Sequence, residues 1–497
     1  MPLTVKRKQL VIAEEVTAGS LAAGIGSGAN ATLLIEDPKI GPNVDMIVRN
    51  FVYDSLTKTA DAAGLVTGRV SFKTEMRGTR IVDSTALPAW DLILRSCGMR
   101  RGPLNDELTI GAITGGPFRH GELVTQAVSS ATARVMHDTF TGATSILLEP
   151  VTGTLNATGL LTGGSTGATA TPSVRTAARA YSWYPWKEVV KQITIASATG
   201  GWGVGVAFKG NTSNARGVVW KAVVATDTTI FYKPIRGTFT NGETLSRLDL
   251  VAGTEVVGGS SGEAFFIWPT ASLRLYEDGT ATTIRGFRGN WEFEALANRP
   301  VMMTFTGVGI MDKATGVEDA TMLTGILYQF GLPPIFEDSA MGFADETVNG
   351  TTGEIEPELG KITFNLGNDP QLRIHAGVAG GAVEAFTGTT RAGSGTFDPE
   401  ATLTVDTPVN YRKKFVNGTI SRLRATVGSV DANRFKFTMP GIQFSGGDRG
   451  ERNGIMTDEM PFICTGGELG NLLGASNTLT SIGGENEIVL TYYIDAP

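Results

Sequence analysis

Apolar and polar residues alternate along many short stretches of this chain. Clear examples are residues 70–73, 291–294, 434–437 and 488–492. Such alternation puts the apolar side chains on one face of a strand and the polar ones on the other, as in a half-buried antiparallel sheet. The pattern predicts a mainly β protein made of many short strands.

Only two segments read as helices. Residues 88–98 begin with a proline and end with a glycine, the usual asymmetry of helix termini, and residues 408–418 share that frame. In both segments the apolar residues recur at helical spacing. We expect four of them to pack the helices onto a core: Trp90, Leu94, Tyr411 and Phe415.

The two helical segments belong to a longer internal repeat. Strand-like segments precede both helices, at 68–72 and 393–397. Further pairs follow: 272–276 with 422–426, 289–293 with 440–444, and 301–306 with 460–465. The spacing falls from 408 − 88 = 320 at the helices to 423 − 273 = 150 afterwards, so the first copy contains 320 − 150 = 170 extra residues.

The extra block is itself repetitive. Residues 145–155 match 229–239 at a spacing of 84, and two such units nearly fill the block. A Gly-x-Phe-x-x-Gly-Glu pattern occurs at 116–122 and 237–243. Glycine permits tight turns, while threonine and valine favour strands, so each unit reads as a small β module.

The chain therefore divides into two β domains, with two modules inserted in the first. The predicted segments are domain A (1–100 and 268–337), module 1 (101–183), module 2 (184–267) and domain B (338–497).

Composition adds information about partners. The 64 glycines suit many tight turns, and 42 basic against 49 acidic residues give a net charge of −7. An acidic chain is a poor candidate for tight binding to duplex DNA. Glu354, Glu356 and Glu358 alternate, so on an extended chain they would face one way, either as an acidic stripe on a shared surface or as a solvated linker.

Candidate chemistry is sparse. His120, His137 and His375 have no metal-ligand spacing, and we expect them at the surface or in turns. The two cysteines form no disulfide framework, and the glycine-rich runs at 24–28 and 201–205 lack a full phosphate-binding pattern. We expect no enzyme activity and no catalytic, cofactor or metal site. No apolar run approaches the length of a membrane span.

An ordered set of motifs resembles a known family. It comprises residues 35–46, 68–78, 88–98, 275–279, 285–293, 304–307, 398–400, 448–450 and 454–456. Together they resemble the major tail tube proteins of long non-contractile-tailed (siphovirus-type) bacteriophages, in the form whose single chain carries two tube folds.

The resemblance implies a fold, an assembly and a location. The tube fold is an antiparallel β-sandwich or half-barrel with one flanking helix, and six such folds form a ring. Two folds per chain would give a homotrimer, whose stacked rings would conduct DNA through the lumen, without specific binding, from capsid to host cell. Other partners would be the tape measure, tail terminator and tail tip proteins. The chain would be assembled in the host cytoplasm, would reside in the virion tail and would have no membrane partner.

The resemblance also gives roles to particular segments. Residues 44–66 and 377–394 would be loops reaching the adjacent ring, and the modules would project outward. Glu354, Glu356 and Glu358 would be the candidate acidic stripe of the lumen, facing the DNA. Two alternatives stay open. The chain could be a tail-tip or adhesin-type protein that binds host-surface glycans through 101–267, or a β-rich hydrolase that uses a pair of carboxylates.

Overall fold

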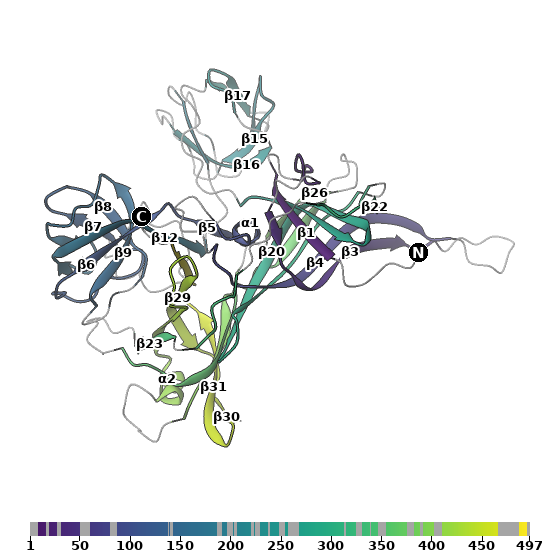
Figure 1. Cartoon of the computed structure of the whole chain (residues 1–497). Coiled ribbons are helices and arrows are strands. Elements are labelled where there is room, and N and C mark those ends of the chain that lie inside the picture. The colour runs from purple at the N-terminus through teal and green to yellow at the C-terminus, as the bar shows by residue number, and fades with distance from the viewer. Residues whose placement is uncertain are drawn as a thin grey trace. The chain divides into compact units, whose positions relative to one another are not determined.

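The structure is a computed structural model of a mainly β chain with two short helices. It describes residues 8–15, 19–26, 31–49, 60–79, 87–137, 139, 143–185, 191–195, 202, 206–219, 223, 229–236, 239–247, 254–256, 268–312, 315–324, 331–337, 339–345, 354–374, 382–387, 391–401, 410–465 and 487–494. Figure 1 shows the arrangement of the labelled elements. The predicted mainly β fold class is confirmed.

Domain A is an antiparallel sheet with one helix. Its strands pair in the order β1–β19–β20–β21–β4–β3, and β2 also pairs with β1. The elements are β1 (Lys8–Glu14), β2 (Ala31–Leu33), β3 (Glu36–Ile47), β4 (Ala62–Glu75), α1 (Asp91–Ser96), β19 (Ala271–Glu277), β20 (Gly279–Leu296), β21 (Met302–Ile310) and β22 (Val317–Ala320). Asp278 stands in the turn that joins β19 to β20.

Domain B repeats that strand order. Its strands pair as β23–β28–β29–β31–β27–β24, again antiparallel throughout. The elements are β23 (Ala340–Asp345), β24 (Leu359–Asn365), β25 (Pro370–Ile374), β26 (Ala382–Thr387), β27 (Ser394–Pro399), α2 (Tyr411–Asn417), β28 (Ile420–Val427), β29 (Arg434–Phe444), β30 (Asp448–Arg452), β31 (Ile455–Cys464) and β32 (Val489–Tyr493). The two domains are therefore two copies of one sheet.

The strand registers correct part of the sequence alignment. Ile284 pairs with Leu273 as Met439 pairs with Leu423, so β20 and β29 are offset by 439 − 284 = 155 residues. Phe305 pairs with Phe72 as Met460 pairs with Phe397, which gives 460 − 305 = 155 for β21 and β31. The sequence-based offsets of 440 − 289 = 151 and 460 − 301 = 159 were wrong by four residues in opposite directions. Short alternating strands look alike at even shifts, so only pairing fixes their register.

Both predicted helices exist, but they are shorter than the predicted segments. In α2 the Asn410 side chain accepts a hydrogen bond from the Lys413 amide at 2.9 Å, and Gly418 ends the helix with a φ of 63°. Trp90, Leu94 and Tyr411 are buried, as expected. The expectation that Phe415 packs in the core is wrong, because that side chain is 37% exposed.

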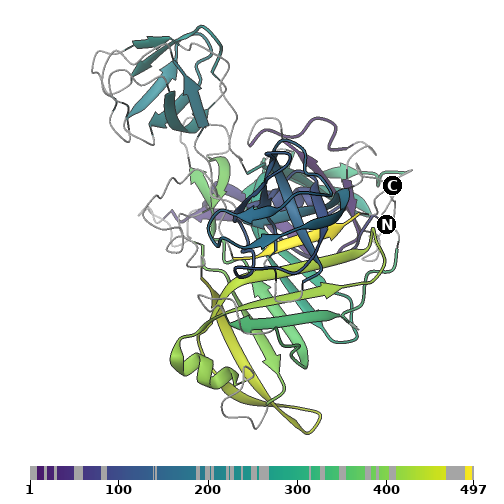
Figure 2. The ribbon, with the colours of Figure 1, turned by 90° about the vertical axis from the view of Figure 1, so that its left-hand side faces the viewer.

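Module 1 is joined to domain B by the C-terminal strand. Its elements are β5 (Met99–Arg101), β6 (Asn105–Ile110), β7 (Leu123–Gln126), β8 (Thr132–Val135), β9 (Ser145–Thr152), β10 (Leu161–Gly163), β11 (Thr169–Ala170) and β12 (Pro172–Pro185). Strand β32 pairs with β12 on one edge and with β29 on the other, so the yellow strand in Figure 2 lies between the module and domain B. Arg179 of β12 reinforces this junction through ion pairs with Glu107 and Asp431.

Module 2 forms a compact unit of its own, residues 187–268, while everything else falls in the other unit. Its strands are β13 (Lys191–Thr194), β14 (Ala207–Gly210), β15 (Arg216–Val219), β16 (Thr229–Arg236), β17 (Thr244–Arg247) and β18 (Thr254–Val256). The core is aromatic: the Phe208 ring lies 5.3 Å from both Trp202 and Phe239, and 5.5 Å from Tyr232. Four large rings compensate for the small size of this unit.

One kind of turn occurs three times among the described residues of the modules. Ser129, Thr166 and Ser213 each accept a hydrogen bond from the amide two residues ahead. In each case the following residue has a positive φ, and the next is a fully buried alanine. The three sites are 129–131, 166–168 and 213–215. The hydroxyl replaces a backbone acceptor, and the small alanine lets the turn close against the module core.

The glutamate of the repeated Gly-x-Phe-x-x-Gly-Glu pattern holds such a turn. Glu122 accepts hydrogen bonds from the Ser165 and Thr166 amides at 2.9 and 2.8 Å. Glu243 accepts from the Thr212 and Ser213 amides at 3.1 and 2.9 Å. Both carboxylates are buried, so the pattern marks a structural clamp between a loop and a turn in each module.

The stability of module 2 should depend on pH through the ionisation of Glu243. Burial raises the pKa of this carboxyl, but hydrogen bonds from Ser213, Thr240 and Thr212 outweigh burial and leave the pKa below its ordinary value. A carboxyl whose pKa is lower in the folded state stabilises the fold above its unfolded pKa, about 4.3 for Glu, and this stabilisation is lost as pH falls through the folded value. Thermal unfolding of the full chain should show a transition for module 2 that shifts down at acidic pH.

The matched variant is Glu243→Gln, which keeps the size and removes the titration. It should lower the unfolding temperature of module 2 at neutral pH and flatten its dependence on acid. An unchanged acid dependence in Glu243→Gln would show that another group is responsible.

Candidate functional site

The two histidines that the structure describes do not form a reactive site. His120 lies in a turn and His137 in a bend, in line with the expected turn placement, but both side chains are buried and neither is at the surface. His375 lies outside the described residues. The His137 ring nitrogens hydrogen-bond with the Thr438 and Thr491 hydroxyls at 2.9 and 2.8 Å. Burial, with the nearby charge of Lys436, lowers the pKa of His137 well below its usual range. A neutral histidine in this setting joins module 1 to β29 and β32.

The two cysteines are not activated as nucleophiles either. Both cysteines are free thiols, and burial raises the pKa of Cys97 and of Cys464 above the ordinary range, which disfavours the nucleophilic thiolate. Within the described ranges, no group of three or more His, Cys, Asp or Glu side chains could hold a metal ion. In the same part of the chain no helix is long and apolar enough to span a membrane.

The three glutamates of the predicted acidic stripe do not share one environment. Glu354 forms an ion pair with Arg424 and is half-buried, which neutralises its charge. Glu356 and Glu358 are exposed. An acidic surface here therefore rests on two residues, and its position facing DNA stays a prediction.

Domain A is joined to domain B by a contact that combines strand pairing, side-chain hydrogen bonds and apolar packing. Strand β24 of domain B pairs with the far half of β20 of domain A, from Glu292 opposite Asn365 to Leu296 opposite Lys361. The two copies therefore share one continuous sheet, visible in Figure 1 where β20 runs down into the strands of domain B. The contact is head-to-tail, because the β24 edge of one copy meets a different strand of the other.

Asparagine side chains fix the register of this contact. The Asn368 amide side chain donates to the Cys97 carbonyl oxygen at 2.6 Å and to the Gly289 carbonyl oxygen at 3.1 Å. Asn290 donates to the Asn365 side-chain oxygen at 2.9 Å and accepts from the Asn368 backbone amide at 2.9 Å. These bonds connect the segment after β24 to the end of α1 and to β20.

Apolar side chains fill the same contact. Phe364 of β24 lies 5.6 Å from Trp291 and 5.8 Å from Phe293, measured between ring centroids. Leu366 is fully buried, and its amide donates to the Trp291 carbonyl oxygen at 3.1 Å. Nothing in the sequence analysis indicated that β24 would pair with β20 or that Asn368 would close the contact.

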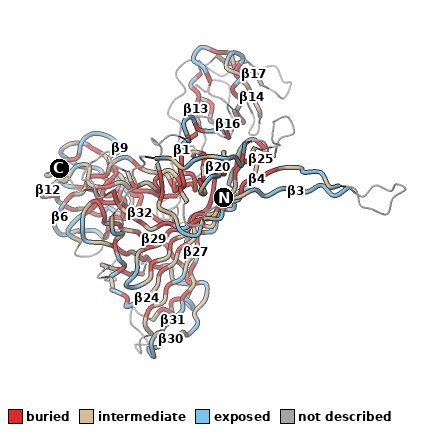
Figure 3. Tube along the Cα trace, turned by 45° about the vertical axis from the view of Figure 1, so that its right-hand side comes forward, coloured by how far each residue is buried: buried red, intermediate tan, exposed pale blue. Residues whose placement is uncertain are grey.

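The two segments expected to be loops reaching another ring are partly strands. Residues 44–47 and 62–66 extend the β3–β4 hairpin into an arm, with Ile47 opposite Ala62. Residues 382–387 form β26, which pairs with β25. The β25–β26 hairpin lies against β20 and β21 of domain A, whereas the β3–β4 arm extends away from its domain with a largely exposed surface (Figure 3).

Comparisons with known proteins add nothing to this description. No protein-family model matches the chain, and no curated protein matches it significantly.

Removing the Asn368 side chain should weaken the contact between the domains. Asn368→Ala leaves the Cys97 and Gly289 carbonyl groups without this donor, at a cost of about 1–3 kcal/mol in the free energy of unfolding. Urea denaturation of the unassembled chain measures the change.

Asn43→Ala is the matched control, because Asn43 is exposed on the arm and its side chain bonds only weakly, at 3.3 Å, to Thr67. This control should change stability by roughly 0.5 kcal/mol at most. Equal effects of the two variants would mean that Asn368 does not stabilise the contact.

Proposed function

We propose that this chain is a structural subunit of a phage tail tube. Three chains would form a ring of six sheet copies, and stacked rings would enclose a lumen that conducts DNA. The observation that carries the proposal is the head-to-tail sheet contact between two copies of one fold within the chain.

A head-to-tail contact between like units generates a ring when the rotation closes and a helical filament when it does not. Within one chain this contact is made once, so domain A still has an edge equivalent to β24, and domain B still has a surface equivalent to β20. Strand edges left unpaired tend to recruit other strands, and closure of a ring removes them. Repetition between chains is therefore the natural continuation of the contact.

Three further features support this function over an enzymatic one. Among the described residues no group of side chains could hold a metal ion, the net charge of −7 disfavours binding of DNA to the wall, and the motif set resembles the tail tube family in order. The proposed partners are other copies of this chain and the tape measure, tail terminator and tail tip proteins, with DNA passing through.

The proposal predicts abundant rings. Purified chain at rising concentration should form species containing three chains by native mass spectrometry, and stacked rings with an open lumen by electron microscopy. In particles of the virus that encodes it, the chain should be among the most abundant proteins. A persistent monomer and a few copies per particle would instead favour the tail-tip or adhesin alternative.

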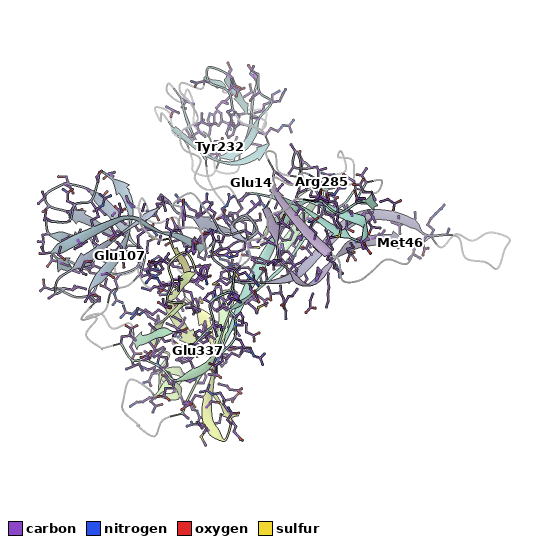
Figure 4. All side chains as sticks on the ribbon, in the orientation of Figure 1. Glu14, Met46, Glu107, Tyr232, Arg285 and Glu337 are labelled. Carbon is purple, nitrogen blue, oxygen red and sulfur yellow. The ribbon has the colours of Figure 1, made fainter. Side chains whose placement is uncertain are left out.

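The exposed acids give a second test. If Glu356 and Glu358 line the lumen, replacing both with lysine should slow DNA ejection from particles, because lysine attracts backbone phosphates, and added salt should relieve the defect. Glu337→Lys is the matched control, since Glu337, labelled in Figure 4, is an exposed acid outside the predicted stripe. Normal DNA ejection by particles that carry the double variant would show that Glu356 and Glu358 do not line the lumen.

A further inference from the structure

The β3–β4 arm of domain A is the counterpart of a segment that already makes a contact in domain B. Gly41 pairs with Arg69 of β4 as Asn365 pairs with Ser394 of β27, so β3 occupies the place of β24. In domain B the chain leaves β24, passes Leu366 and forms the β25–β26 hairpin against β20 and β21. In domain A the chain continues along β3 into the arm.

The arm carries apolar side chains that nothing in its own domain buries. Val44, Met46 and Ile47 are exposed, with Met46 and Ile47 at 50% and 54%. Figure 4 shows Met46 far out on the arm. At the corresponding position in domain B, where the chain leaves β24, Leu366 is fully buried against domain A. Exposed apolar residues gathered on one projecting hairpin mark a contact surface.

Domain B exposes apolar side chains at positions that domain A buries. Met456 of β31 is 57% exposed, whereas Val301, its counterpart by the 155-residue offset, is fully buried. Val416 of α2 is 80% exposed, whereas Ser96 of α1, its counterpart at 416 − 96 = 320, is fully buried. Phe415 and Ile463 add to this exposed group, so domain B lacks a cover that domain A has.

Two strand edges match in the same way. Glu292 pairs with Thr304 as Asp448 pairs with Glu459, so β30 occupies the place of the far half of β20. Among the described residues, β30 pairs only with β31 and β3 only with β4, which leaves one edge open on each. Copying the β20–β24 register would set Gly41 opposite Asp448 and Asp37 opposite Arg452, the latter a pair of opposite charges.

We propose that the β3–β4 arm binds sideways to a second copy of this chain. Residues 37–41 of β3 add to the β30 edge of that copy as an antiparallel strand, and Val44, Met46 and Ile47 continue past Asp448 to cover Ile463 and the exposed face of α2. The partner is thus the neighbouring chain within a ring and not a chain in the next ring. This inference rests on the proposed assembly and specifies its contact.

Cysteine cross-linking tests the contact directly. In Gly41→Cys/Asp448→Cys, mild oxidation of the assembled protein should link chains to one another. An ideal Cβ at Gly41 meets no atom within 4 Å, so the new side chain fits. A sideways contact predicts a closed series of linked species that stops at the number of chains in one ring. The matched control Gly41→Cys/Glu337→Cys should stay unlinked, because Glu337 is exposed but lies outside the proposed contact.

The possible outcomes test the sideways contact and the tube proposal separately. Assembly without cross-links, or cross-links that extend without limit along stacked rings, would overturn the sideways contact and leave the tube proposal standing. Cross-linked chains that never stack into tubes would uphold the contact and count against the tube. Absence of both assembly and cross-links at high concentration would overturn both.

A charge on the arm gives an independent measurement. Met46→Glu should weaken association between chains about tenfold or more, because a buried apolar anchor is replaced by a charge. Val128→Glu is the matched control, since Val128 is an exposed apolar residue on module 1. Sedimentation at several concentrations measures both, and equal association of Met46→Glu and the unmodified chain would exclude the arm from the contact.

Discussion

The need of every strand edge for a hydrogen-bonding partner organises this molecule. A sheet edge presents a row of amide and carbonyl groups, and leaving them unpaired invites other strands. Domain A and domain B meet this requirement for each other along β20 and β24. The C-terminal strand β32 meets it for module 1 and domain B together. Because the sheet is duplicated, the same requirement arises again. The contact within one chain uses β24 and β20 but leaves their counterparts, the β3 edge of domain A and the β30 edge of domain B, to be paired.

Polar groups in the interior select the geometry of these contacts. Asn368 bonds to carbonyl oxygens of domain A, His137 bridges two threonines at the junction of module 1, and Glu122 and Glu243 each hold a turn. A buried polar atom that loses its partner is costly, so each of these groups penalises a shifted register. Apolar burial gives the assembly its stability, and the polar bonds determine which alignment is stable.

The two modules bury their apolar side chains in different ways. Module 1 belongs to the same compact unit as the two domains and shares strands with them, whereas module 2 forms its own unit around four aromatic rings. Both use the same hydroxyl-capped turn and the same buried glutamate, although the glutamate stands in the first half of module 1 and in the second half of module 2. The sequence motif therefore marks a turn clamp, which explains its recurrence without a binding role.

The sequence by itself determined the mainly β class, the two helices and the duplication, because alternation, terminal prolines and glycines, and repeated spacings are local signals. The segment predicted as module 2, residues 184–267, lies close to the compact unit 187–268. The tertiary structure alone decided the register of β20 with β24, the roles of Asn368 and His137, the pairing of Glu354 with Arg424 and the exposure of Phe415. These depend on which edges meet, and pairing between strands that are distant in the chain leaves no mark in local periodicity.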